Sequence, residues 1–418
     1  MDAPGLHVKA LSKSARGIRS LFSKAPSAAQ ALDRAARLLR RKLPGQVAVA
    51  GDVIKLDLHP ASGAVELRAG EDGALCVDAP AAALGPGYVR YVVALLDELL
   101  DEVDFVWDRE AGGYVADRDV AALEQTFLRW LQAELGQIRD GGASRQLGMP
   151  QVPRYVVDAP VLTPMGPRSK AWCDAVLADG AAGRDFWPLW DLATPAALAR
   201  ARALWLLWME VPWRLPMGDL EEEVMEATHR ELSAALRLAP EQELPWAEWA
   251  ELVDYLDLDD EVTPAVRERG VPLDPVQGYR RYPAYFDLTA GWSLLLTPNF
   301  ADSWQHDGAS MVATDGERSV RCSCAEADGP PDQILAKIPM RGEILARLEE
   351  GGYHGRVEAV DDEDGLRVLT AIMTTEGSAA IVTIVVRRGD EEWGLATWRT
   401  LERASAERRA DAAQAAPA

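Results

Sequence analysis

The stretch YVRYVVALLDELLDEVDFV, residues 88–106, predicts the clearest amphipathic helix of the chain. Its apolar side chains recur at helical spacing, while its carboxylates fall on the opposite side. Before it, residues 52–58, 65–68 and 74–77 are short runs of β-type residues separated by turn sequences, which predicts a three-stranded meander. A second helix is expected from about Asp119 to Ile138. Residues 44–142 are therefore expected to form a small α+β domain.

The segment before this domain, residues 1–43, is basic and predicts a helical arm. It carries ten Lys or Arg against Asp2 and Asp33, whereas the whole chain has a formal net charge of −22. An apolar stripe contains Leu32, Leu38 and Leu39. One interpretation is an arm that binds a membrane surface or nucleic acid. The other is a helix docked on the acidic remainder of the protein, with its arginines in water.

The middle of the chain is rich in tryptophan. Residues 143–170 are rich in Pro and Gly and predict a linker, and residues 171–262 predict an all-α domain. Eight of the 14 tryptophans fall between residues 172 and 249, and six of them form Trp-x-x-Trp pairs. Such rings serve either as core or as contacts for a partner, and we expect core for these pairs with one pair exposed. We expect Trp187 and Trp190 to lie exposed in a groove, because Pro188 places them on a loop.

Phe186 and Trp213 complete this predicted binding surface. The alternative for these aromatic residues is burial in the core of the helical domain.

The last third of the chain predicts an antiparallel sheet with one packed helix. A second linker at residues 263–283 precedes a domain at 284–403, and residues 404–418 are expected to be a frayed tail. Asp315-Gly316 is the strongest hairpin signal. A helix is expected from about Asp332 to Glu349, and strands at residues 356–359, 366–374, 380–386 and 394–400. The predicted fold class is thus multidomain α+β.

This C-terminal segment of about 120 residues resembles the Mog1/PsbP-like fold. The similarity lies in the opening Gly291-Trp292 strand, the hairpin, the single crossing helix and the closing strands with Trp393 and Trp398. Members of that fold class serve as partner-binding modules, photosystem assembly subunits and chaperone-like proteins of type VI secretion effectors. The resemblance implies interaction rather than catalysis, and it assigns no functional residue.

Three residue patterns resemble parts of metal sites. Glu226-x-x-His229 lacks the second such unit that a di-metal site requires, which favours an edge-of-core histidine. The acidic run from Asp257 to Glu268 has Val262 where a calcium loop needs Gly. Cys322 and Cys324 are expected to lie on a strand as buried, unbridged thiols. No metal and no cofactor is expected.

The sequence contains no nucleophile elbow, Walker loop or dinucleotide fingerprint. His306, beside Asp302 and Asp307, is the least implausible general base, and a polar surface turn explains it as well. No catalytic residue is therefore predicted.

Four scattered cysteines, the absence of a secretory signal and the absence of an 18-residue apolar run favour the cytoplasm. The acidic body suits a protein partner with a basic surface and disfavours nucleic acid. We expect a non-enzymatic interaction protein, such as an adaptor, chaperone or immunity-type protein of a bacterial toxin or secretion system. The alternative is a hydrolase-type enzyme with a site assembled between the middle and C-terminal domains.

Overall fold

The computed structural model describes residues 3–13, 27–70, 72–108, 110, 112–141, 145–150, 153–296, 299–305, 308–362 and 365–404. It confirms the multidomain α+β class. The chain divides into two compact units. The first comprises Met1–Gln151, Asp158–Val211 and Glu223–Gln277, and the second comprises Val152–Val157, Pro212–Glu222 and Gly278–Ala418. Each unit is described by itself.

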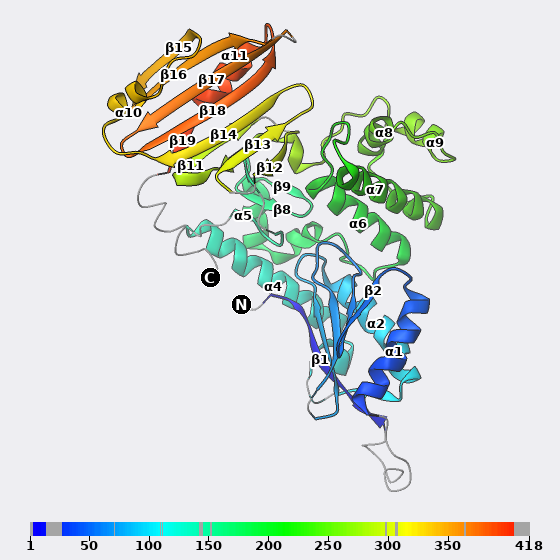
Figure 1. Ribbon diagram of the computed structural model, residues 1–418. Helices are drawn as coiled ribbons and strands as arrows, with labels where there is room; N and C mark the ends of the chain where they lie inside the picture. The colour runs from blue at the N-terminus through cyan, green and yellow to red at the C-terminus, as the bar shows by residue number, and fades with distance from the viewer. Residues whose placement is uncertain are drawn as a thin grey trace. The chain divides into compact units, whose positions relative to one another are not determined.

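The first unit is built on a six-stranded antiparallel sheet in the order β2-β3-β4-β5-β1-β6 (Figure 1). Its strands are β1 (Gly5–Ser12), β2 (Val47–Ala50), β3 (Val53–Leu56), β4 (Val65–Ala69), β5 (Leu75–Pro80) and β6 (Phe105–Trp107). The predicted meander is confirmed as β3, β4 and β5. Side chains alternate between the two faces of a strand, so Ile54, Leu67 and Val77 enter the core. The opposite face is polar, with the Lys55–Glu66 ion pair across β3 and β4.

Helices cover the apolar face of this sheet. α1 (Ala28–Lys42) and α2 (Pro86–Glu102) pack on the strands, and α4 (Val120–Arg139), which follows the short α3 (Tyr114–Asp117), packs on α2. Ser27 and Gln30 form a capping box at the start of α1, which satisfies two backbone N–H groups that would otherwise lack partners. The predicted helix at residues 88–106 is shorter than expected, because the chain leaves α2 after Glu102 and forms β6. The predicted second helix is confirmed as α4.

The prediction of helical segments in the N-terminal arm is wrong for residues 5–12. These residues form β1, which lies between β5 and β6 and pairs with both. Leu6 and Ala10 are buried while His7 and Lys9 are exposed, the two-residue period of a strand. The basic composition had obscured this alternation. Residues 14–26, including Pro26, lie outside the described residues.

The docked-helix interpretation fits α1. Its side chains Leu32, Ala35 and Leu39 are buried in the same hydrophobic core as the sheet and α2. The segment predicted as an arm therefore contributes a central strand and a helix to the first unit.

The rest of the first unit is mostly helical. After the hairpin of β8 (Val161–Thr163) and β9 (Gly166–Arg168) come α5 (Lys170–Ala178), the 3-10 helix η4 (Gly180–Phe186), α6 (Pro195–Met209), α7 (Asp219–Leu238), α8 (Trp246–Tyr255) and α9 (Thr263–Gly270). Thr194 caps α6, and Pro195 stands at its first position. Both predicted linkers therefore contain regular structure. The core that contains β1 and α1 continues as far as Ala201.

The second unit has two antiparallel sheets. The smaller has the order β19-β11-β10-β7, with β7 (Arg154–Tyr155), β10 (Ala284–Asp287), β11 (Trp292–Leu296) and β19 (Glu402–Arg403). The larger has the order β12-β13-β14-β18-β17-β16-β15. Its strands are β12 (Ala301–Trp304), β13 (Ser310–Thr314), β14 (Ser319–Glu326), β15 (Glu343–Glu350), β16 (Tyr353–Asp361), β17 (Leu366–Thr375) and β18 (Ser378–Arg387). Short 3-10 turns η5 (Tyr279–Arg281) and η6 (Thr289–Gly291) flank β10. The Asp315-Gly316 hairpin is confirmed between β13 and β14.

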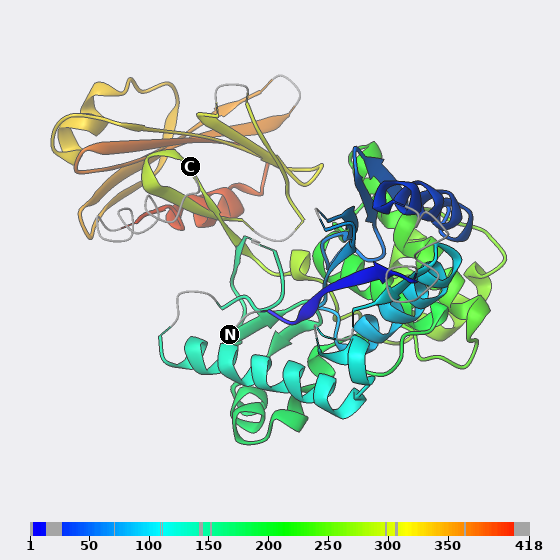
Figure 2. The same ribbon diagram turned by 90° about the horizontal axis from the view of Figure 1, so that it is seen from below.

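Two helices pack on the larger sheet, α10 (Pro331–Lys337) and α11 (Glu391–Arg399). Figure 2 shows α11, drawn in red, along one face of the strands. The predicted strand at residues 394–400 is wrong, because those residues belong to α11. Trp398 is fully buried there, and a Cβ at Gly394 would lie 2.5 Å from Leu369 Cδ1, so glycine permits close packing on β17.

The predicted helix from Asp332 to Glu349 is also wrong in its second half. The helix α10 ends at Lys337, and residues 343–350 form β15, which pairs with β16. Pro339 cannot continue a helix hydrogen-bond ladder. A Cβ at Gly342 would lie 2.3 Å from the Ala359 carbonyl oxygen, so a larger residue would push the chain away from β16. Among the described residues, no helix has both the length and the apolarity that a membrane crossing requires.

Candidate functional site

The predicted exposure of Trp187 is wrong. Trp187 is 4% exposed, and Phe186 is fully buried. The Trp187 ring contacts those of Phe186 and Phe127, with centroids 5.0 and 5.6 Å away, and its Nε1 donates to the Ala82 carbonyl at 2.8 Å. These partners lie about 60 to 105 positions earlier in the sequence, apart from the adjacent Phe186. The ring is therefore part of the core of the first unit.

The loop that carries Trp187 is held closely against the start of α2. A Cβ at Gly87 would lie 1.6 Å from the Asp191 carbonyl oxygen, and one at Gly85 would lie 2.7 Å from Trp187 Cβ. The Gly85-Pro86-Gly87 sequence thus permits the approach that buries the ring. Trp190 is half-buried, with its centroid 5.3 Å from that of Trp187 and the Arg184 guanidinium 5.4 Å from its own.

Trp213, in the second unit, is also buried. It is 2% exposed, and the guanidinium of Arg281 lies 3.6 Å from its ring centroid. Within the described residues the exposed large apolar side chains include one tryptophan, Trp304 on β12, at 44%. Three of the four predicted binding residues, Phe186, Trp187 and Trp213, are part of a core. A binding role for these four, which include Trp190, stays a prediction.

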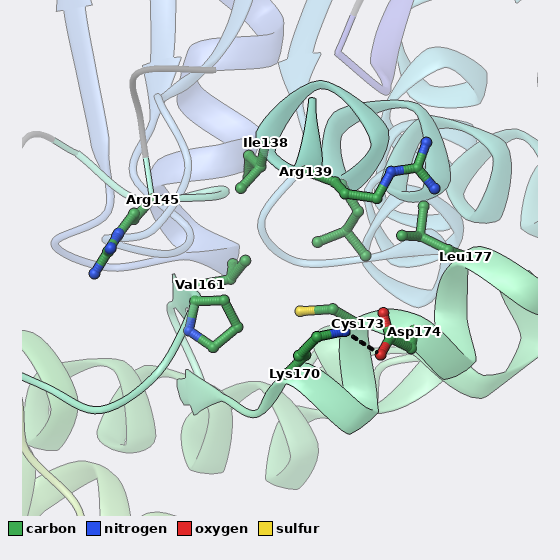
Figure 3. Close-up of a pocket in the computed structure, with 10 residues that line it drawn as sticks. Ile138, Arg139, Arg145, Val161, Lys170, Cys173, Asp174 and Leu177 are labelled. Atoms are coloured by element: carbon green, nitrogen blue, oxygen red, sulfur yellow. Dashed lines mark hydrogen bonds and ion pairs between the residues drawn. The ribbon is translucent and has the colours of Figure 1, made fainter. Parts of the chain in front are cut away.

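A cavity of the first unit lies between α4, β8 and α5 (Figure 3) and has a volume of about 410 Å³. This is within the usual range for ligand pockets. Its walls are mainly apolar, and they come from the last turns of α4, the segment before β8 and one face of α5. The apolar lining residues are Leu135, Ile138, Pro160, Val161 and Leu177.

Three cations stand around this apolar pocket: Arg139, Arg145 and Lys170. All three are exposed. Lys170 Nζ lies 2.6 Å from Asp174 Oδ2, and Arg139 Nε lies 3.0 Å from Asp140 Oδ1. Arg145 forms no ion pair with a described residue. Asp174 lines the pocket as well, so Arg145 is the lining cation whose charge no carboxylate of the described residues neutralises.

The one thiol of the pocket is suited to packing rather than to attack. Burial raises the pKa of Cys173, and the neighbouring Asp174 raises it further. A thiol with a raised pKa is protonated near neutral pH, whereas a nucleophilic cysteine requires the thiolate. The lining residues include no histidine or serine. The arrangement can bind an apolar group beside an anion, and it offers no activated nucleophile.

The sequence did contain a signal for this pocket. Lys170, Cys173, Asp174 and Leu177 have the i, i+3, i+4, i+7 spacing of one helix face, and α5 presents all four to the cavity (Figure 3). The predicted linker ended at residue 170, so this face was divided between two predicted segments. The wall contributed by α4 lies about 35 residues earlier.

His229 is an edge-of-core histidine, as the sequence favoured. Trp249 Nε1 donates to His229 Nδ1 at 3.1 Å, and His229 Nε2 lies 2.8 Å from Asp260 Oδ2. Because an indole nitrogen only donates, the neutral imidazole carries its proton on Nε2 and donates it to Asp260. Glu226 is exposed and pairs with Arg230 instead. Both ring nitrogens of His229 therefore have protein partners.

Asp260 also holds the start of α9. Its Oδ1 accepts hydrogen bonds from the backbone N–H groups of Val262 and Thr263. Despite partial burial, the hydrogen bonds from His229 and Thr263 lower the pKa of Asp260. The acidic run considered as a calcium loop thus uses this carboxylate for local structure. Among the residues that the structure describes, no three His, Cys, Asp or Glu side chains gather as a metal-ligand set.

Cys322 and Cys324 lie on β14 and are buried and unbridged, as predicted. Burial raises the pKa of both thiols, that of Cys324 to about 12. His306 and Asp307 lie outside the described residues, while Asp302 is an exposed residue of β12.

Comparison with known proteins leaves the family of this chain open. No family model matches the sequence, and no curated protein matches it. Among solved structures, a protein from Bacteroides thetaiotaomicron is similar at 14% identity and a TM-score of 0.24, covering 29% of this chain and 49% of that one. This chain therefore spans about half the length of that protein. Cyanobacterial PsbP (CyanoP) from Synechocystis is similar at 11% identity and a TM-score of 0.23, covering 29% of this chain and 92% of that one. Structural similarities with TM-scores this low support no conclusion about function.

Proposed function

We propose that this chain is a non-enzymatic binding protein of the cytoplasm that recognises a protein partner through the pocket between α4, β8 and α5. The observation that carries the proposal is a mainly aliphatic cavity that has Arg139, Arg145 and Lys170 among its lining residues. Adaptor, chaperone and immunity-type proteins share this mode of action, in which recognition alone is the activity.

The chemistry of the pocket selects the kind of group that enters. An aliphatic chain gains about 25 cal/mol for each Å² that leaves water, and the apolar walls provide that burial. A carboxylate at the end of the same chain would pair most readily with Arg145, which has no ion pair with a described residue, because Arg139 and Lys170 already pair with Asp140 and Asp174. Such a group occurs at the C-terminus of a protein that ends in Leu, Ile or Val, and also in a fatty acid. We favour the protein C-terminus.

The charges of Arg139, Arg145 and Lys170 contribute to the specificity of binding more than to its affinity. The cations are exposed, so each contact with a carboxylate contributes about 0.2 to 1 kcal/mol. A ligand with the same side chain and no negative charge should therefore bind more weakly by about 1 kcal/mol, a factor of about five. The acidic remainder of the chain suits a basic surface elsewhere on the partner, which stays a prediction.

Calorimetric titration with three probes tests the proposal. Acetyl-Gly-Gly-Leu with a free carboxylate should bind better than the same peptide with a C-terminal amide, and better than decanoate. Leu177→Trp, which fills the half-buried wall, should abolish binding, and Arg145→Glu should weaken it. Arg399→Glu, the same charge change on exposed α11, is the matched control and should leave binding unchanged.

Two results would contradict the proposal. Equal affinity for the peptide acid and the peptide amide would show that Arg139, Arg145 and Lys170 do not recognise the C-terminal carboxylate. Tight binding of decanoate with no binding of the peptide would identify a lipid-like ligand instead of a protein partner. A hydrolase-type activity of this chain remains the alternative, and release of products from the peptide acid during the titration would favour it.

A further inference from the structure

One edge of the sheet in the first unit is unprotected. The strand β2, with the sequence Val47-Ala-Val-Ala50, ends the six-stranded order and pairs with β3 alone. It contains no charged residue, no proline and no bulge, and three of its four residues are exposed. Edge strands usually carry such features because free N–H and C=O groups attract other strands.

The other sheet edges show the contrast. The edge strand β15 carries Glu343, Arg347 and Glu349 and has a register shift between Ile344 and Ala346. The edge strand β12 carries the exposed Asp302, and β7 and β19 are only two residues long. β6, at the far edge of the same sheet, has three residues. Among the described strands, β2 is the edge that combines four residues with no such protection.

The register of β2 shows which groups are free. Gln46 accepts a hydrogen bond from Asp57, so residues 46, 48 and 50 direct their backbone groups toward β3. Val47 and Val49 therefore direct theirs away from the sheet, and no described residue pairs with them. Their side chains share the core face with Leu56 and Ile54, and Val49 remains 42% exposed.

We propose that β2 pairs antiparallel with β2 of a second copy of this chain, about a twofold axis at Ala48. In that register Val47 of each copy faces Val49 of the other, and both outward-facing pairs form hydrogen bonds. The small side chain of Ala48 faces its own counterpart on the axis. The two six-stranded sheets then form one continuous sheet, and Val49 loses contact with water.

Charge complementarity favours a second copy over an unrelated strand. In this antiparallel pairing the Gly51-Asp52 turn that follows β2 in one copy lies at the end where β2 of the other copy begins, and Asp52 is exposed. The last turn of α1, two residues before Pro44, carries Arg40, Arg41 and Lys42, of which Lys42 pairs with Glu98 of its own chain. At each end of the paired strands, Asp52 of one copy therefore lies near the cationic last turn of α1 of the other copy. The chain as a whole is acidic, so such a cationic segment is unusual in it. A strand from another protein would match this pattern only by chance.

The register makes disulfide formation a specific test. Non-hydrogen-bonded residues facing each other across antiparallel strands have Cα atoms about 4.5 Å apart, within the range that a disulfide bridges. In the full chain with Cys76→Ser, which removes the partly exposed native thiol, Ala48→Cys should form a covalent dimer on mild oxidation. Ala50→Cys should not, because in this register the two copies of residue 50 are separated by about 13 Å along the strand.

Sedimentation equilibrium of the full chain provides the second measurement. At loading concentrations between about 2 and 200 µM, the mass should rise from 45.5 kDa toward twice that value. Val49→Lys should remain monomeric. Val360→Lys is the matched control, because Val360 is a similarly exposed strand valine, at 46%, and receives the same charge. It should dimerise like the parent chain.

The possible outcomes are decisive. A monomer at every concentration overturns the proposal, and so does loss of dimer in both valine variants. Equal cross-linking at positions 48 and 50, or none at either, also overturns it. Should Val49→Lys fail to fold, as circular dichroism would reveal, the cross-linking pair still decides, because both alanines are exposed.

Discussion

Replacing Trp187 with Ala tests whether the tryptophan pairs are core. The ring is 4% exposed, and a tryptophan removes about 200 Å² from water, which corresponds to about 5 kcal/mol at 25 cal/mol per Å². Measured Trp→Ala changes in cores cost about 3 to 5 kcal/mol. The variant also leaves the Ala82 carbonyl without the indole donor, which adds about 1 kcal/mol or more. We expect a loss of about 4 to 6 kcal/mol in the free energy of unfolding of the first unit.

Urea unfolding followed by circular dichroism measures this loss, with the two units treated as separate transitions. Trp304→Ala is the matched control, since the same ring is removed from a site that is 44% exposed, and it should cost about 1 kcal/mol or less. Trp187→Phe should fall between the two, because it retains a ring and loses the hydrogen bond. If Trp187→Ala costs no more than Trp304→Ala, the burial argument is wrong and the exposed-groove hypothesis regains its support.

Three further predictions concern the N-terminal segment, a buried ion pair and a buried histidine. Deleting residues 1–43 removes β1 and α1, so we expect the first unit to lose its cooperative unfolding transition, and a melting temperature lowered by only a few degrees would contradict this. Glu358→Ala leaves the buried Arg356 guanidinium without its carboxylate at 2.5 Å and should cost about 3 to 5 kcal/mol, whereas Arg356→Met combined with Glu358→Leu should cost less in the same denaturation assay. Burial lowers the pKa of His59 to about 3, so the unfolded chain takes up its proton first as pH falls below about 6.5. The stability of the parent chain relative to His59→Asn should then fall by about 1.4 kcal/mol per pH unit between about pH 6.5 and 3, and parallel pH profiles would refute the assignment.

The elements that local sequence predicts are those whose determinants are local. The α4 helix, the cap at Thr194 and the Asp315-Gly316 hairpin each depend on residues within a few positions. The failures depend on distant partners. Residues 343–350 have helix-forming composition, yet they become a strand because β16 offers a pairing edge. The strand β1 was obscured by its basic neighbours, although its alternation was present in the sequence.

The pocket could be predicted only in part, for the same reason. The helical spacing from Lys170 to Leu177 was visible in the sequence, but the opposite wall on α4 is supplied by the tertiary fold. Exposure of Trp187 was equally undecidable from its own neighbourhood. Gly85 and Gly87, about 100 residues earlier, determine how closely the loop approaches α2.

The tryptophan excess has a physical explanation that needs no binding surface. An indole ring fills a large apolar volume, while its one N–H can bond a polar group at the edge of the core. Here indole nitrogens connect elements that are distant in sequence: Trp187 to Ala82, Trp249 to His229 and Trp292 to Ser378. Each of these bonds gives a buried or partly buried acceptor a donor, and a buried polar group left without any partner costs about 1 to 3 kcal/mol. A phenylalanine could supply the volume but not the bond. Among the described residues, the buried Nε1 atoms of Trp205, Trp213 and Trp393 have no hydrogen-bond partner, so those rings contribute packing without such a bond.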